Sequence, residues 1–204
     1  MEMAHKNQEE ITRKGNPRKP QGEEGEQMLQ RMNESHAAVT QWALGFLDFG
    51  EEDQALDIGC GGGAALKRMS EKIPKGHLTG VDYSPVSVEL SRETNAQDIQ
   101  NGKMEVLEAS VEHLPFEDGS FDKIITVESF YFWPDPAENL KEVLRILKKG
   151  GVFLLIADIY QKEGLRESVL ENIKQYHLFN PTKEEFRRLF EQAGFAETRI
   201  HTKE

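Results

Sequence analysis

Apolar and polar positions divide the chain, from residue 54 onward, into short apolar runs that alternate with amphipathic stretches. Apolar runs of five to seven residues predict strands at 54–58, 77–81, 103–108, 121–127 and 151–157. Between them, apolar residues recur every three or four positions and predict helices at 63–73, 85–100 and 136–148. Strands that alternate with helices indicate a parallel sheet covered on both faces. The sequence therefore predicts an α/β fold with a doubly wound, mostly parallel sheet.

The two ends of the chain follow other patterns. Residues 1–24 are polar and contain prolines and glycines, which predicts a flexible N-terminal arm. Residues 25–49 carry a helical pattern that favours one or two helices with a break near Asn33–Ser35. Further helices are predicted at 165–177 and 183–193, and a last strand at 195–202. We expect residues 25–204 to form a single domain.

Three helix starts have capping residues that support these boundaries. Ser84 precedes Pro85, and Asp135 precedes Pro136, so each pair supplies an N-cap side chain and a proline at the first helical position. Thr182 stands three residues before Glu185, the spacing of a capping box. These signals predict helices that begin after residues 84, 135 and 182.

A glycine-rich turn between the first strand and the next helix is the strongest chemical signal in the sequence. The strand ends near Asp57, and the turn contains Gly59, Gly61, Gly62 and Gly63. Glycines accept a positive φ and let the backbone approach a ligand closely. The second strand ends in Asp82, and an acid there is placed to bond the hydroxyl groups of a ribose. The sequence therefore predicts a site for an adenosine-containing cofactor.

The glycine pattern leaves two cofactor classes to compare. Residues 59–64 also fit the G-x-G-x-x-A pattern of dinucleotide sites, and a single match of that kind is weak. Asp57 lies two residues before the first glycine, where its negative charge disfavours a pyrophosphate and favours the ammonium group of an amino-acid tail. An NAD(P)-dependent oxidoreductase thus stays as the weaker alternative, without a Tyr-x-x-x-Lys pair to support it.

Downstream segments add a resemblance to a known family. Residues 114–122 read LPFEDGSFD ahead of one strand, and residues 147–151 read LKKGG ahead of another. Together with LDIGCGGG at 56–63, they resemble the class I S-adenosylmethionine-dependent methyltransferases of the small-molecule type, over roughly residues 53–158. The resemblance implies transfer of a methyl group from S-adenosylmethionine to a small-molecule acceptor by direct displacement, with S-adenosylhomocysteine as product. It also implies a C-terminal antiparallel hairpin, of which this sequence supplies one strand.

The resemblance assigns roles to particular residues. Cofactor contacts are expected in the glycine loop, at the ends of the second and fourth strands and in the loop after the third, from Asp57, Gly59, Cys60, Gly61, Asp82, Tyr83, Ser110, Val111 and Glu128. Relatives often carry Asp-Ala where this chain has Ser110-Val111, and their acid bonds to the adenine amino group. In this chain either the Ser110 hydroxyl or the Val111 backbone is expected to recognise the adenine. Segments 17–25 and 25–49 resemble those that form a lid over the cofactor.

Two residues are candidates for the chemistry at the acceptor. His36 is a candidate general base, because an imidazole changes its protonation state near neutral pH. Tyr131 belongs to the aromatic run 130–133 and is expected to face the site, where aromatic rings favour the sulfonium charge. Methyl transfer can also proceed without a base, if the protein only aligns the acceptor with the methyl group.

The composition of the chain excludes or disfavours several further classes of function and partner. The net charge of −11 disfavours nucleic acid as a partner, and the sequence has no apolar run long enough for a membrane span. The single cysteine, Cys60, excludes an internal disulfide and a cysteine-rich metal site, and no metal is expected. The polar N-terminus lacks a signal peptide, which favours the cytoplasm. A cofactor-binding protein without catalysis stays open as an alternative, and the oligomeric state is not indicated.

Overall fold

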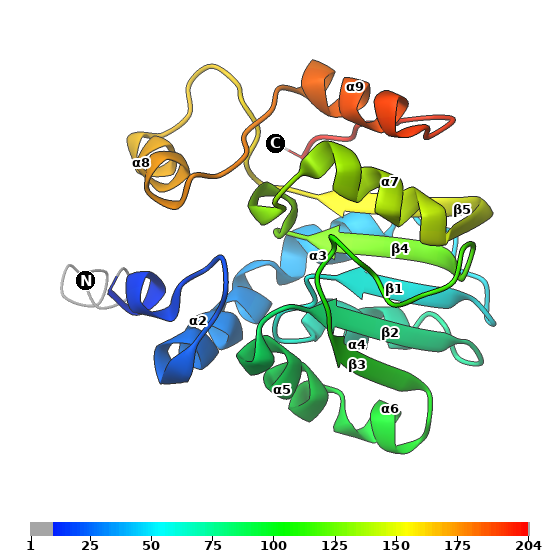
Figure 1. Ribbon diagram of the computed structural model, residues 1–204. Coiled ribbons are helices and arrows are strands. Elements are labelled where there is room, and N and C mark those ends of the chain that lie inside the picture. Colours follow the sequence, from blue (N-terminus) through cyan, green and yellow to red (C-terminus); the bar gives the residue numbers. More distant parts are fainter. Residues whose placement is uncertain (1–9, 204) are drawn as a thin grey trace.

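Five parallel strands form one sheet in the order β3-β2-β1-β4-β5 (Figure 1). The computed structural model describes residues 10–203. The strands are β1 Gln54–Ile58, β2 His77–Asp82, β3 Met104–Glu108, β4 Phe121–Val127 and β5 Leu147–Ile156. The chain runs outward from β1 to β3 and then returns to build β4 and β5 on the other side. The prediction of a doubly wound parallel sheet is confirmed.

Helices cover both faces of the sheet. They are α2 Gly22–Ser35, α3 Ala37–Leu44, α4 Ala64–Ser70, α5 Pro85–Thr94, α6 Ala96–Gln100, α7 Pro136–Ile146, α8 Glu167–Tyr176 and α9 Lys183–Ala193, with a short 3₁₀ turn at Phe130–Phe132. Side chains of α7 and α9 share one core cluster with alternate residues of the sheet, among them Leu56 and Ile124. Side chains of α3, α4 and α5 share a second cluster with the intervening residues, among them Ala55 and Ile125. This alternation is what a strand with two buried faces requires.

The predicted helix starts agree with the structure. The Ser84 hydroxyl accepts a hydrogen bond from the Ser87 N–H, and the Asp135 carboxylate accepts one from the Glu138 N–H. The box formed by Thr182 and Glu185 is complete. Each cap satisfies a backbone donor that the helix itself leaves free.

Several boundaries differ from the prediction, and the largest differences concern the helix at 85–100 and the start of β5. The helix expected at 85–100 is two helices, α5 and α6, because the buried side chain of Asn95 donates hydrogen bonds to the Gly63 and Ser91 carbonyls and the helix is interrupted there. Helix α7 ends at Ile146, and β5 begins at Leu147, which pairs with Phe121. That strand start is four residues earlier than expected.

The prediction of a strand at 195–202 was wrong. Residues 195–203 have no regular secondary structure, and within residues 10–203 the only strand that pairs with β5 is β4. Side-chain packing holds the segment instead, since Phe195 packs on Phe190 and the His201 ring stacks on Phe46 at 4.0 Å. These two ring contacts fix the segment without a ladder of backbone hydrogen bonds.

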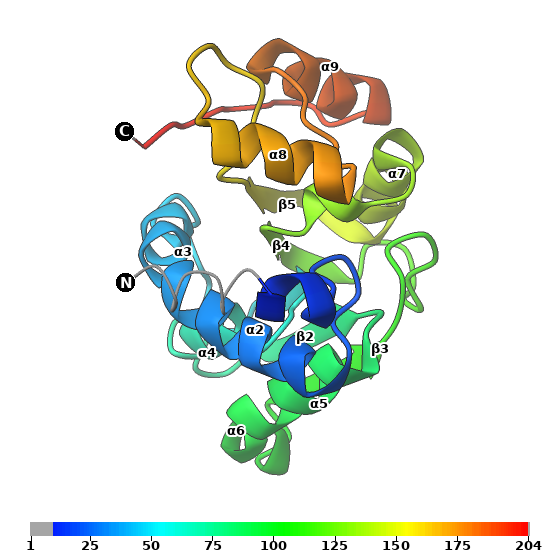
Figure 2. The same cartoon turned by 90° about the vertical axis from the view of Figure 1, so that its left-hand side faces the viewer.

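The N-terminal helices lie at the edge where the strands end (Figure 2). Helix α2 begins at Gly22, three residues before the predicted start, and the break before α3 falls at His36. Residues 10–15 are also helical, whereas residues 1–9 of the predicted arm lie outside the described residues. No helix within the described part of the chain has the length and apolar character to cross a bilayer.

Candidate functional site

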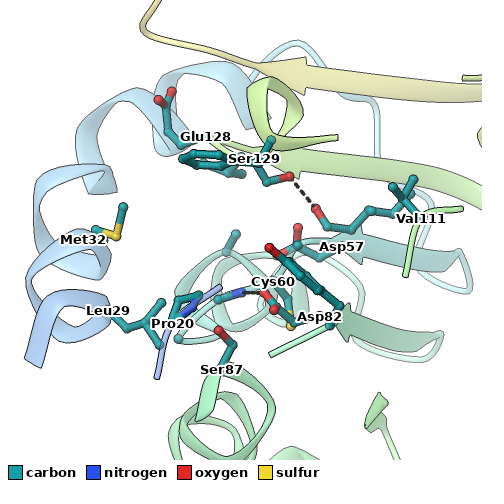
Figure 3. Close-up of a pocket in the computed structure, with 18 of the residues that line it drawn as sticks. Pro20, Leu29, Met32, Asp57, Cys60, Asp82, Ser87, Val111, Glu128 and Ser129 are labelled. Atoms are coloured by element: carbon teal, nitrogen blue, oxygen red, sulfur yellow. Dashed lines mark hydrogen bonds between the residues drawn. The ribbon is translucent and has the colours of Figure 1, made fainter. Parts of the chain in front are cut away.

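A cavity of about 280 Å³ opens at the carboxyl ends of β1, β2 and β4. This is the point where the strand order reverses, and ligands of doubly wound sheets bind in the crevice there. Figure 3 shows Leu29 and Met32 of α2 on one side of this cavity and Asp57 and Ser129 on the other. The glycine loop, the strand ends and the N-terminal helices therefore line the same cavity.

The glycine loop is fixed by backbone hydrogen bonds to the next strand. The N–H groups of Gly59 and Cys60 both donate to the Val81 carbonyl, at 2.8 and 3.0 Å. Gly59 has a φ of +72°, and a Cβ there would lie 2.6 Å from the Ser129 Oγ. Only glycine fits both the backbone conformation and the space, so the loop can lie flat against the end of β4.

Asp57 is a buried acid with an unpartnered oxygen. Its side chain is 1% exposed, and its Oδ1 has no hydrogen-bond partner within the described residues. Burial, and next the charge of nearby Asp82, raise the pKa of Asp57 to about 8. A buried carboxyl group without a donor is destabilising. It is therefore suited to receive a cationic donor such as an ammonium group.

Asp82 binds the loop and the following helix together. Its Oδ2 accepts from the Gly61 N–H at 3.0 Å, and its Oδ1 accepts from the Ser84 N–H at 2.9 Å. Burial raises the pKa of Asp82, while these two N–H donors act in the opposite direction. Each carboxylate oxygen keeps a further lone pair for a ligand hydroxyl. The side chain thus holds the loop and still offers acceptors to the cavity.

The loop after β3 lines the end of the cavity where an adenine is expected. Val111 is buried there, and Tyr83, which also lines the cavity, is 37% exposed. The Ser110 hydroxyl donates to the Glu112 carboxylate at 3.1 Å and accepts from the Glu112 N–H at 3.2 Å. Glu112 also lines the cavity. Sequence reasoning looked for the acid at position 110 and missed Glu112, two residues later in the same turn.

Glu128 lies at the end of β4 in an uncommon backbone conformation. Its φ is +53°, in the left-handed region that disfavours side chains with a Cβ. Burial and then the charge of Asp158 raise the pKa of Glu128 to about 8. One carboxylate oxygen accepts from the Asp158 N–H at 2.7 Å. Strain of this kind, kept at the mouth of a cavity, is typical of functional positions.

The aromatic turn after β4 differs from the expectation in one respect. Tyr131 is 5% exposed and is absent from the cavity lining, whereas its neighbours Phe132 and Trp133 line it. The Trp133 indole N–H donates to the Ser129 hydroxyl at 3.4 Å. Placing Tyr131 as the ring that faces the site was therefore wrong, because the 3₁₀ turn directs the next residue there.

His36 reaches the cavity from the junction between α2 and α3. It is half-buried and lines the cavity together with Met32 and Asn33. Burial lowers the pKa of His36, while the charge of Asp158 opposes this. The Asn33 side chain donates to the Gly62 carbonyl at 3.1 Å, which fastens α2 to the glycine loop. The neutral imidazole that a base requires is thus favoured at the site.

Residues 17–20, here termed the strap, cross from one rim of the cavity to the other. The Tyr83 hydroxyl donates to the Arg18 carbonyl, and the Ser84 hydroxyl donates to the Pro20 carbonyl at 2.6 Å. On the opposite rim, the Arg18 guanidinium lies 5.8 Å from the centre of the Phe132 ring and donates to the His177 carbonyl at 3.5 Å. The strap therefore contacts the ends of both β2 and β4.

Two further residues line the cavity in different ways. Cys60 is buried, with its Sγ 3.7 Å from the Ser91 hydroxyl, and burial raises the pKa of its thiol. Arg68 of α4 also lines the cavity, and sequence reasoning missed it because a cation on a helix usually faces solvent. Among residues 10–203, no group of three or more His, Cys, Asp or Glu side chains is arranged to hold a metal ion.

Comparison with known proteins identifies the family. Residues 56–155 match the family described as a methyltransferase domain. Demethylmenaquinone methyltransferase of Staphylococcus aureus is 31% identical over 172 residues, covering 73% of this chain and 70% of that enzyme. The chain belongs to the class I S-adenosylmethionine-dependent methyltransferases. The glycine loop and Asp82 are among the parts of this methyltransferase fold that line its cavity.

Other relatives of this methyltransferase chain are longer or more distant. The chloroplastic 2-methyl-6-phytyl-1,4-hydroquinone methyltransferase 1 of rice is 30% identical over 147 residues, which is 72% of this chain and 42% of the rice enzyme. The chain thus spans about two fifths of the rice relatives it matches, at 42% and 40% of their lengths. A chain of the complex between the Haloferax volcanii Trm112 methyltransferase activator and its methyltransferase partner is 30% identical, with a TM-score of 0.72 over 81% of this chain and 71% of that one.

One more distant structure supports the fold alone. Phosphoethanolamine N-methyltransferase 2 of Haemonchus contortus, solved with phosphomonomethylethanolamine and S-adenosylhomocysteine, has a TM-score of 0.70 at 20% identity. The match covers 78% of this chain and 37% of that enzyme. Methyltransferases of this fold are therefore known with the cofactor product bound.

Proposed function

We propose that this chain binds S-adenosylmethionine in the cavity and transfers its methyl group to a small-molecule acceptor. The observation that carries the proposal is the pairing of an unpartnered buried acid, Asp57, with a glycine loop held by Asp82, at the point where the strand order reverses. The family supports the same cofactor. The named quinone-type enzymes among the relatives support a small-molecule acceptor.

The cavity fits the proposed cofactor in its charges and its shape. Asp57 Oδ1 is an acceptor without a donor, which matches the ammonium group of the methionine portion. Gly59 and Gly61, at φ +72° and +51°, allow the backbone to pass close to a ligand. Asp82 offers acceptors for the ribose hydroxyls, and Tyr83 and Val111 flank the place for the adenine. Ser110 or Glu112 can serve the adenine amino group.

At the acceptor side of the cavity, the chain's residues align the acceptor with the methyl group and enclose both. When bound, S-adenosylmethionine supplies an electrophilic methyl carbon attached to a sulfonium. Met32 from α2 and Phe132 from the turn after β4 present apolar surfaces that exclude water. Burial lowers the pKa of His36 and so favours its neutral form, and in this proposal His36 takes a proton from a hydroxyl or amine acceptor. These surfaces favour an apolar or ring-bearing acceptor, as in the quinone-type relatives.

Two alternatives make different predictions. A protein that binds the cofactor without catalysis keeps the affinity but transfers no methyl group. A nicotinamide-dependent oxidoreductase binds NADH in place of S-adenosylmethionine, although Asp57 supplies a carboxyl group and no cation where a pyrophosphate would lie.

The test combines binding and turnover. Calorimetry with S-adenosylhomocysteine and with NADH decides the cofactor. Incubation with radiolabelled S-adenosylmethionine and a cell extract, followed by extraction of small molecules, decides catalysis. Binding of NADH with no binding of S-adenosylhomocysteine would refute the proposal. A bound cofactor with no labelled product from extracts or from quinols would leave the non-catalytic alternative in its place.

A further inference from the structure

We infer that Arg68 binds the carboxylate of the cofactor's amino-acid portion, and thereby selects cofactors that retain this group. The inference rests on the proposed function, since it concerns the same cavity. It adds a residue that neither the sequence motifs nor the acids of the site point to.

Among the residues that the structure describes, Arg68 has no acidic partner. It lines the cavity from α4, is half-buried, and makes one hydrogen bond, from its Nη1 to the Ala64 carbonyl at 2.8 Å. Within residues 10–203 no carboxylate forms an ion pair with it, although the chain has 36 acidic and 25 basic residues. Its neighbour Lys67 points elsewhere and lies 3.8 Å from Asp98. A guanidinium has five donors, so most of those on Arg68 are free for a ligand.

The opposite charge lines the same cavity. Asp57 contributes a buried oxygen without a donor, and Arg68 contributes donors without an acid. An α-amino acid group carries an ammonium and a carboxylate on one carbon, and so complements both. Ala64 and Ala65 also line the cavity on α4, and their small side chains leave room between the glycine loop and Arg68. The planar guanidinium fork matches a carboxylate in a bidentate manner.

An acidic group on the acceptor is a second possible source of the carboxylate. The two sources are separated by a cofactor analogue that lacks only the carboxylate. S-adenosylhomocysteine and its decarboxylated form, an aminopropylthio-adenosine, differ in this group and share the ammonium, the ribose and the adenine.

The experiment measures both ligands by calorimetry on four proteins. Wild type is expected to bind S-adenosylhomocysteine roughly 10- to 100-fold more tightly than the decarboxylated analogue, the range of a charge-assisted hydrogen-bonded pair. Arg68→Ala should bind the analogue as wild type does and lose the preference for the carboxylate. Arg68→Lys should keep part of the preference. Lys67→Ala removes the same charge from the adjacent position and should keep all of it.

Three outcomes overturn the inference. The first is an Arg68→Ala protein that keeps the wild-type preference, which leaves the proposed cofactor in place and moves any acid recognised by Arg68 to the acceptor. The second is an equal loss of both ligands in Arg68→Ala and Arg68→Lys, which shows that the side chain supports the loop and does not read the carboxylate. The third is a wild-type protein that binds neither ligand, and this outcome refutes the proposed function as well.

Discussion

Replacing Asp57 by asparagine should stabilise the ligand-free protein and weaken cofactor binding. Asp57 is 1% exposed, and burial and the charge of Asp82 raise its pKa from 3.8 to about 8. At about 1.36 kcal/mol for each pKa step of one, the buried carboxyl costs on the order of 5 kcal/mol at pH values above about 8 and less at lower pH. Asparagine has nearly the same shape and no ionisable proton.

The pH dependence gives this prediction its sign. Below about pH 4 Asp57 is protonated in both the folded and the unfolded chain, so its contribution vanishes. As the pH rises towards 8, the unfolded chain releases a proton that the folded chain retains, and the stability falls. The free-energy gain from Asp57→Asn should therefore increase by about 2–3 kcal/mol between about pH 6 and about pH 8.5.

Urea denaturation of both proteins at the two pH values measures this gain. Glu128, whose pKa is also about 8, is present in both proteins and cancels in the difference. Asp48→Asn, at an exposed position, serves as the control and should show no such trend. Stability curves of wild type and Asp57→Asn that stay parallel over this range would refute the reasoning about burial.

Cofactor binding supplies the second arm of the same prediction. An ammonium group next to Asp57 favours its ionised form, so binding near neutral pH should release close to one proton. Calorimetry in two buffers of different ionisation enthalpy measures that proton, which Asp57→Asn should not release. The same substitution should weaken binding of S-adenosylhomocysteine by roughly 10- to 100-fold. Proton release that persists in Asp57→Asn would assign it to another group.

Three further predictions concern the rest of the site. Asp82→Ala should weaken binding of S-adenosylhomocysteine by about 1.5–3 kcal/mol in calorimetry, and unchanged affinity would remove Asp82 from the ribose site. Once an acceptor is known, turnover of Phe132→Ala and His36→Asn separates two mechanisms. If alignment of cofactor and acceptor alone drives transfer, Phe132→Ala should lower turnover more than His36→Asn. A loss of roughly 10²–10⁴-fold in His36→Asn, together with loss of the acidic limb of the pH–rate profile, would show that His36 is the base. Hydrogen exchange across residues 17–36 should slow when S-adenosylhomocysteine is added, and equal exchange with and without it would exclude closure of this segment.

The sheet and the glycine loop were predictable because they depend on short segments. Each strand was a compact apolar run, and each of the acids Asp57 and Asp82 lay at a strand end beside a glycine turn or a helix cap. Parallel strands bring such ends to one edge of the sheet, so their meeting follows from topology. The capping residues before α5, α7 and α9 were equally local.

The features that were missed depend on contacts between distant segments. Helix 85–100 is interrupted because Asn95 bonds to Gly63 in another loop, which the helical pattern does not encode. The segment 195–202 was expected to form a strand, but within residues 10–203 it pairs with no other strand. Whether Tyr131 or Phe132 faces the cavity is decided by one step of a 3₁₀ turn. Arg68 looks like any solvent-facing cation until α4 is packed beside the cavity.

The strap couples the shape of the acceptor entrance to the release of the cofactor product. One four-residue segment touches Tyr83 and Ser84 beside the proposed cofactor end of the cavity and Phe132 beside the proposed acceptor end. Tyr83 and Ser84 bind backbone carbonyls of the strap, so a substitution at Arg18 that shifts the strap backbone to reshape the acceptor entrance should also change how long the cofactor product stays bound. Engineering of a new acceptor preference through this segment will alter product release at the same time, whereas changes confined to α8 leave the Tyr83 and Ser84 contacts intact.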